Sequence, residues 1–156
     1  MIKEKPLGYY LGQTLHLVKL RLIAEFKEKQ VDMSFENFLL LHFISEHEDL
    51  TQQDLANHFQ KDKSIVLRHI NALIDKRYVV RLQDKEDKRK KNIILTKKGY
   101  DALTYSKKIA KDTSEELLTG VTDEEFANFK NVLKKIKANT GLEDTSCTLG
   151  KGNQDE

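Results

Sequence analysis

The chain has 156 residues, of which 33% are charged, and its formal net charge is only +2. No segment approaches the roughly 18 consecutive apolar residues of a membrane span, and the first residues lack the apolar stretch of a secretion signal, so we expect residence in the cytoplasm and no membrane partner. The single cysteine, Cys147, excludes an internal disulfide framework, and the length suits one domain with a substantial core.

Two helices are predicted in the first third of the chain. Residues 7–29 should form a long amphipathic helix, because their apolar residues recur at helical spacing. The main stripe of that helix is Leu11, Leu15, Val18, Leu22 and Phe26. A single small domain cannot cover such a helix, which therefore indicates a packing partner. Ser34 is a good N-cap for a second helix over residues 35–47, which is so apolar that we expect it to be the central scaffold.

Residues 51–75 predict two short helices in succession. The Thr51 hydroxyl is expected to cap the first, whose residues Leu55, Ala56 and Phe59 share one face. Asp62 is expected to cap the second. The residues of the second helix predicted to face inward are Ile65, Val66, Ile70, Leu73 and Ile74.

A β-hairpin is predicted next, because residues 78–82 and 92–96 are rich in β-branched and aromatic side chains. Leu50 is expected to begin a further short strand. Eight of the nine residues in the connecting loop, 83–91, are charged, so this loop lies in solvent. Two helices followed by a two-stranded wing are the order of a winged helix-turn-helix.

The basic charge is concentrated on this predicted unit. Between Gln60 and Lys98 there are 13 Lys or Arg against 5 Asp or Glu, a balance of +8, so the remainder carries 14 against 20, a balance of −6. Binding to nucleic acid by counterion release requires such a local excess of cations.

Two more helices are predicted in the last third. Thr96 is expected to cap a helix running from Lys97 to about Leu118, with Gly120 as its stop. Thr122 and Glu125 form a capping box that opens the last helix. The stripe of that helix is Phe126, Phe129, Val132, Leu133 and Ile136. Pairing the apolar faces of the first and last helices across a two-fold axis would bury both, which predicts a homodimer.

Several short segments of this chain resemble the MarR family of bacterial regulators. These segments are Leu50-Thr51-Gln52, Asp62-Lys63-Ser64, Asp84 to Arg89 and Leu95-Thr96-Lys97-Lys98-Gly99. The likeness extends more loosely over roughly residues 7–138. It departs from the family at Leu67, where a small hydroxyl residue is usual.

The resemblance implies a mainly α fold with a small β-wing. Residues 1–139 would be one MarR-type domain, with the winged helix-turn-helix at about 34–99 and dimerisation helices at about 7–29 and 100–138. Residues 140–156, rich in Gly and polar side chains, are expected to form a disordered tail. The implied function is sequence-specific transcription regulation by a homodimeric repressor on a pseudo-palindromic operator, released by a small phenolic or anionic effector.

Eleven residues are candidates for contact with double-stranded DNA. Arg68 is suited to guanine in the major groove, whereas helical phase decides whether His69 and Asn71 face the groove. Arg89 resembles the family's wing-tip arginine that enters the minor groove, and Asp87 is expected to steady it by an ion pair. The full set is Lys61, Lys63, Ser64, Leu67, Arg68, His69, Asn71, Asp87, Lys88, Arg89 and Lys90. The alternative is an ordinary solvated helix face and a generic charged hairpin.

Other kinds of site have weaker support. Tyr9, Tyr10, Phe35 and Phe38 are candidates for an effector pocket, although core packing explains them equally well. No cofactor or metal is expected, since His42 and His47 are five residues apart rather than the four that place two ligands on one helical face. No catalytic motif is present, so an enzyme is not expected. A winged-helix protein-interaction module and a nonspecific architectural DNA binder stay as alternatives.

Overall fold

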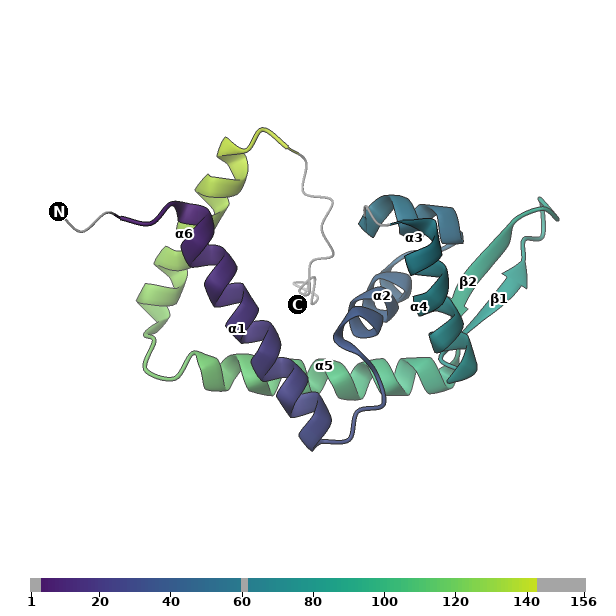
Figure 1. Ribbon diagram of the computed structural model, residues 1–156, viewed down its shortest axis with the longest axis horizontal. Coiled ribbons are helices and arrows are strands. Elements are labelled where there is room, and N and C mark those ends of the chain that lie inside the picture. The colour runs from purple at the N-terminus through teal and green to yellow at the C-terminus, as the bar shows by residue number, and fades with distance from the viewer. Residues whose placement is uncertain (1–3, 60–61, 143–156) are drawn as a thin grey trace, which may run out of the picture.

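The computed structural model describes residues 4–59 and 62–142, and within these ranges the chain forms six helices and two strands (Figure 1). The elements in order are α1 Leu7–Glu28, α2 Phe35–Glu46, α3 Gln52–Phe59, α4 Lys63–Asp75, β1 Val79–Gln83, β2 Lys91–Leu95, α5 Lys97–Leu117 and α6 Asp123–Asn139. This confirms the mainly α fold with a small wing.

Helix α2 is the central helix of the winged unit. The Ser34 hydroxyl accepts a hydrogen bond from the Asn37 amide at 3.1 Å and so begins the helix. Phe38 and Leu41 are completely buried, and α2 packs against α4, α5 and β2. The expected scaffold helix is therefore confirmed.

Helices α3 and α4 form the helix-turn-helix. The Thr51 hydroxyl accepts a hydrogen bond from the Asp54 amide at 3.2 Å, and the Asp62 carboxylate accepts one from the Ser64 amide at 2.7 Å. Both expected caps are therefore present. The inward face of α4 consists of Val66, Ile70 and Leu73, with Ile74 half-buried.

The expectation for Ile65 was wrong. Its side chain is 37% exposed, whereas that of Val66 is 3% exposed. Adjacent helical residues are separated by about 100° around the axis. Since the core lies along one side of α4, it buries Val66 and leaves its neighbour at the margin.

Strands β1 and β2 pair antiparallel, with Val79 opposite Leu95 and Gln83 opposite Lys91. The further strand expected at Leu50 is reduced to an isolated bridge between Thr51 and Asn92, with the Ile93 amide donating to the Leu50 carbonyl at 2.8 Å. Asp49 has a positive φ of 54° and α3 begins at residue 52, so the extended segment is too short for a strand.

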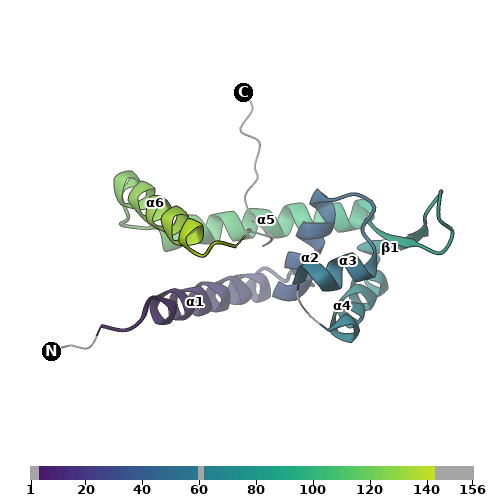
Figure 2. The same cartoon turned by 90° about the horizontal axis from the view of Figure 1, so that it is seen from above.

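Helices α1, α5 and α6 extend as an arm away from the wing (Figures 1 and 2). The Thr96 hydroxyl caps α5, and the capping box of Thr122 and Glu125 begins α6, as expected. Only the C-terminal part of α1 reaches the core, through Leu22 and Phe26, and α6 has no buried residue. None of the helices within residues 4–59 and 62–142 has the length and apolarity that crossing a membrane requires.

Candidate nucleic-acid interface

The solvent-facing side of α4 is an open, shallow concavity beside the wing. It lies opposite the buried face of Val66, Ile70 and Leu73, and its residues recur at helical spacing. The concavity is lined by Ser64, Leu67, Arg68, Asn71, Ala72 and Asp75. Four of the residues predicted to touch DNA therefore share one exposed surface, which offers hydroxyl, guanidinium and amide donors.

The N-terminus of α4 adds Lys63 to this surface. Asp62 is held as a carboxylate, because hydrogen bonds from the Ser64 hydroxyl and then the Ser64 amide lower the pKa of Asp62. Lys63 is exposed beside this cap. The predicted site residue Lys61 lies outside the described residues, as does Cys147.

Asn71 is joined to the wing by a residue that the sequence did not single out. The Arg81 guanidinium, on β1, donates from Nη2 to the Asn71 amide oxygen at 2.7 Å. Arg81 is one of several cations in this region, and no spacing rule connects it with a helix ten residues earlier. This hydrogen bond between the exposed side of α4 and the wing is therefore visible only in the folded chain.

The wing loop is organised by Asp84. One oxygen of its carboxylate accepts the amides of Glu86 and Asp87 at 2.8 and 2.9 Å, and the other accepts the side-chain amide of buried Asn92 at 2.9 Å. The Asp87 amide is the main cause that lowers the pKa of Asp84, followed by the Asn92 amide. A charged acceptor that binds several N–H groups fixes the loop's shape.

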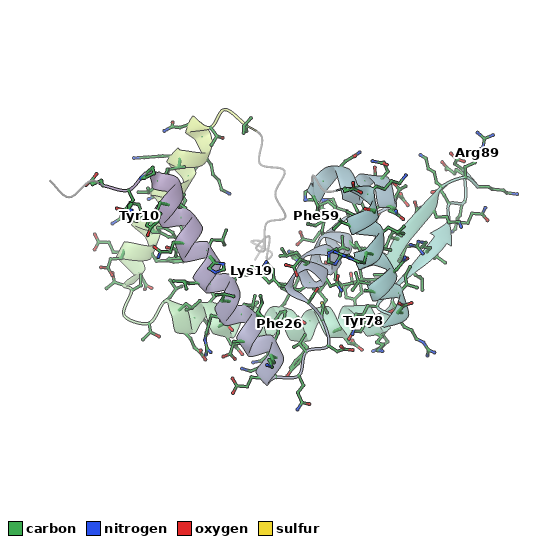
Figure 3. The ribbon with its side chains drawn as sticks, viewed as in Figure 1. Tyr10, Lys19, Phe26, Phe59, Tyr78 and Arg89 are labelled. Atoms are coloured by element: carbon green, nitrogen blue, oxygen red, sulfur yellow. The ribbon has the colours of Figure 1, made fainter. Side chains whose placement is uncertain are left out.

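Arg89 projects from the tip of the wing (Figure 3). The expected ion pair with Asp87 is not present among the described residues, and the Asp87 carboxylate instead accepts the Arg89 backbone amide at 3.0 Å. The aspartate thus shapes the turn, and the guanidinium is left in solvent. Lys88 and Lys90 are exposed beside it.

His69 lies on a different side of α4 from the concavity. It is half-buried, and its Nδ1 is 2.7 Å from the Asn37 side-chain oxygen on α2. It also borders a small, mostly apolar pocket of about 60 Å³ behind α4. This position suits packing between α2 and α4 better than contact with a groove.

The four candidate effector residues are divided between the start of α1 and the core of the winged unit. Tyr9 and Tyr10 are about half exposed near the start of α1, whereas Phe38 is fully buried and packs edge-on against Phe26, with ring centroids 5.4 Å apart. Tyr10 and Phe26 are at opposite ends of α1 (Figure 3). Phe38 is a core residue, and Phe35 is half-buried beside it.

Three histidines of the winged unit, His42, His47 and His58, belong to packing contacts. His47 and His58 stack on the Phe43 ring at centroid distances of 4.0 and 3.8 Å, and burial lowers the pKa of His58. His42 is buried, with Nε2 3.7 Å from a Glu46 carboxylate oxygen. No cluster of three His, Cys, Asp or Glu suited to a metal ion occurs within residues 4–59 and 62–142.

Replacing Asp84 with alanine should disorder the wing loop while leaving the helices folded. The amides of Glu86 and Asp87 lose their charged acceptor, so their protection from hydrogen exchange should fall roughly tenfold, the loss expected for a charge-assisted hydrogen bond. In the wild type, protection should also fall as the pH drops through the lowered pKa of Asp84, because protonation removes the acceptor charge.

The measurement is amide exchange followed by NMR. Asp101→Ala is the matched control, since Asp101 is an exposed aspartate whose partner is the exposed Lys97. Equal protection of both loop amides in Asp84→Ala and Asp101→Ala would show that Asp84 does not order the wing.

Comparison with known proteins relates this arrangement to DNA-binding regulators. Residues 33–91 match the model of the MarR family. The chain is 25% identical over 117 residues to the uncharacterized HTH-type transcriptional regulator YybA of Bacillus subtilis, covering 75% of this chain and 78% of the relative. It is 25% identical over 140 residues to the HTH-type transcriptional regulator SarZ of Staphylococcus haemolyticus, covering 88% and 94%.

Solved structures agree over most of the chain. Apo MarR from E. coli superposes with a TM-score of 0.76 at 24% identity, covering 86% of this chain and 98% of that one, which is a likeness of fold. S. aureus MepR in its complex with DNA superposes with a TM-score of 0.72 at 25% identity, covering 87% and 99%.

Proposed function

We propose that this chain, whose residues 33–91 match the model of the MarR family, is a homodimeric transcriptional repressor of a pseudo-palindromic operator. The main support is that the exposed donor surface of α4 lies next to a wing that has Arg89 at its tip (Figure 3). The similar MepR has been solved in complex with DNA. Such a regulator would act in the cytoplasm, as a binding protein and not as an enzyme.

The exposed side of α4 is proposed to enter the major groove, where base edges distinguish all four base pairs. Arg68 would read guanine, and Lys63 and Ser64 would contact base edges or phosphates near the start of the helix. Leu67 offers only apolar contact, for example with a thymine methyl group. Lys61 is proposed to bind phosphate on the approach to the helix.

The wing is proposed to follow the adjacent minor groove. Arg89 would enter it, since a narrow A-rich groove attracts arginine through its negative potential. Lys88 and Lys90 would add charge along the backbone, and Asp87 would act through the turn that it shapes. His69 would contact DNA only if DNA binding replaced its hydrogen bond to Asn37 with one to the DNA.

A second copy of the chain is proposed to cover the arm. The exposed apolar residues of α1 and α6 include Leu15, 69% exposed, and Phe129, 51% exposed. A two-fold axis through the arms would give two α4 helices about one helical turn of DNA apart, or roughly 10 base pairs between half-site centres.

A small phenolic or anionic effector is proposed to shift the spacing between the two α4 helices of the dimer. The pocket behind α4 holds only about 60 Å³, against roughly 300 Å³ or more for an ordinary small-molecule site. The space between the arm and the winged unit in the dimer is therefore the proposed location. Lys19, whose Nζ is 5.1 Å from the Phe35 ring centroid and 2.9 Å from a Glu36 carboxylate oxygen, would supply a cation there when an anionic effector replaces Glu36.

Binding-site selection tests the proposal, using wild type, Arg68→Ala and Arg89→Ala at one salt concentration. Losing Arg68 should cost about 1 to 3 kcal/mol and relax the preference at one position in each half-site. Losing Arg89 should weaken binding to many DNA sequences together, and most strongly to sites with A-rich flanks.

The alternatives give different results in the same selection. An architectural DNA binder would enrich no sequence, and a protein-interaction module would show no salt-dependent DNA binding. If Arg68→Ala keeps the full core preference while Arg89→Ala alone loses it, the proposed division between helix and wing is wrong.

A further inference from the structure

The hydrogen bond between Arg81 and Asn71 determines which atoms Asn71 presents to solvent. Arginine carries only donors, so the amide atom 2.7 Å from Nη2 must be the oxygen, and the orientation of this amide is chemically unambiguous. Both side chains are exposed, and Asn71 lines the concavity together with Arg68. Its free end is therefore the NH₂ group.

Arg81 is well placed to maintain this orientation. In β1 only Val79 is buried, so the following residues of the strand are free of the core. Within residues 4–59 and 62–142, Arg81 forms no ion pair with a carboxylate, and its bond to Asn71 crosses from the wing to the recognition helix. A planar guanidinium with five donors can hold one oxygen and still reach a phosphate.

The orientation changes what Asn71 can read. A free asparagine recognises adenine by two bonds, in which its oxygen accepts from N6 and its NH₂ group donates to N7. Arg81 takes one of the two lone pairs of this oxygen and places its positive charge beside the other, so a second donor such as adenine N6 is disfavoured there, whereas the NH₂ group still donates. Guanine presents two neighbouring acceptors, N7 and O6, in the major groove, and so it matches a side chain that only donates.

We propose that Arg81 is a specificity-determining residue, which holds the Asn71 amide so that it selects guanine over adenine at one position in each half-site. This inference rests on the proposed function, because it assumes that α4 lies in the major groove. It adds a base preference and a residue of the wing strand that positions the reader.

The test is binding-site selection on full-length wild type, Arg81→Met, Asn71→Ala and the double variant. Arg81→Met should free the amide oxygen and shift the guanine-to-adenine ratio at the affected position toward adenine by roughly 5- to 150-fold, the range of one bidentate contact. Asn71→Ala should abolish the preference there, and adding Arg81→Met should change that position no further. Lys85→Met is the matched control, since it removes one exposed cation from the wing loop without touching Asn71.

Three outcomes would overturn the inference. Arg81→Met could lower affinity for all sequences equally, as Lys85→Met should, which would make Arg81 a phosphate contact only. The guanine preference could survive in Asn71→Ala, or the wild type could prefer adenine at this position. In each case an intact palindromic preference would leave the proposed function standing, whereas a wild type that selects no sequence would reject both.

Discussion

Replacing Gly99 with alanine should destabilise the protein by about 3 kcal/mol or more, an effect at the upper end for overpacking. Gly99 is buried in the first turn of α5. A Cβ atom there would lie 2.0 Å from the Tyr78 carbonyl oxygen and 2.8 Å from the carbonyl carbon. Both are main-chain atoms, so no side-chain rotation can relieve the clash.

The Tyr78 carbonyl is also held in place. It accepts the Thr96 amide at 3.0 Å and is 3.3 Å from the Thr96 hydroxyl, which itself caps α5 through the Gly99 amide. Accommodating a methyl group therefore means separating α5 from the start of the hairpin. The variant would then lose the contact between the wing and α5 in addition to part of its folding free energy.

Denaturant unfolding monitored by circular dichroism measures this effect. Gly12→Ala is the matched control: Gly12 lies inside α1, nothing is within 4 Å of its added Cβ, and a gain of about 0.5 to 1 kcal/mol is expected from helix propensity. If the two variants unfold at the same denaturant concentration, the close approach of Gly99 to Tyr78 does not constrain the fold.

The double variant Phe129→Glu, Val132→Glu should separate the proposed dimer and lower operator affinity by roughly 100-fold or more, since each half-site would then be bound without the avidity of its partner. The two side chains are 51% and 53% exposed in the single chain. They contribute nothing to the core, so each protomer should stay folded. Carboxylates placed in an apolar interface are costly to desolvate.

Sedimentation at micromolar concentration and a gel-shift on the selected operator measure the two effects. Asn131→Glu adds a carboxylate to the opposite side of α6 and should leave the dimer intact. Deleting residues 1–29 is a poorer test, because it removes Leu22 and Phe26 from the core. A wild-type protein that sediments as a monomer, or a double variant that stays dimeric, would reject the proposed interface.

Helix ends were readable from the chain because their signals are local. Thr51, Asp62, Thr96 and Thr122 each bond to an amide two or three residues ahead, so the cap and the group that it satisfies occur in the same short segment. The same holds for the hairpin, whose charged loop and β-branched flanks lie within 19 residues, from 78 to 96. Fold class and element order therefore follow from the amino-acid sequence.

The direction in which individual side chains point was decided by packing between elements. Helical spacing could not tell whether Ile65 or Val66 faces the core, or that His69 turns toward Asn37 on α2, 32 residues earlier in the chain. Asp87 was expected to form an ion pair with the Arg89 side chain. The turn that Asp84 sets instead directs the Asp87 carboxylate to the Arg89 backbone amide.

The contact between Arg81 and Asn71 arises in the same way. Sequence by itself identified a basic, winged helix-turn-helix chain, because charge, periodicity and caps are properties of neighbouring residues. Only the tertiary structure placed a strand residue against α4, since that contact depends on how the hairpin packs on this helix. Rotation of each helix about its axis is set by the core that several elements share, and no single segment encodes it.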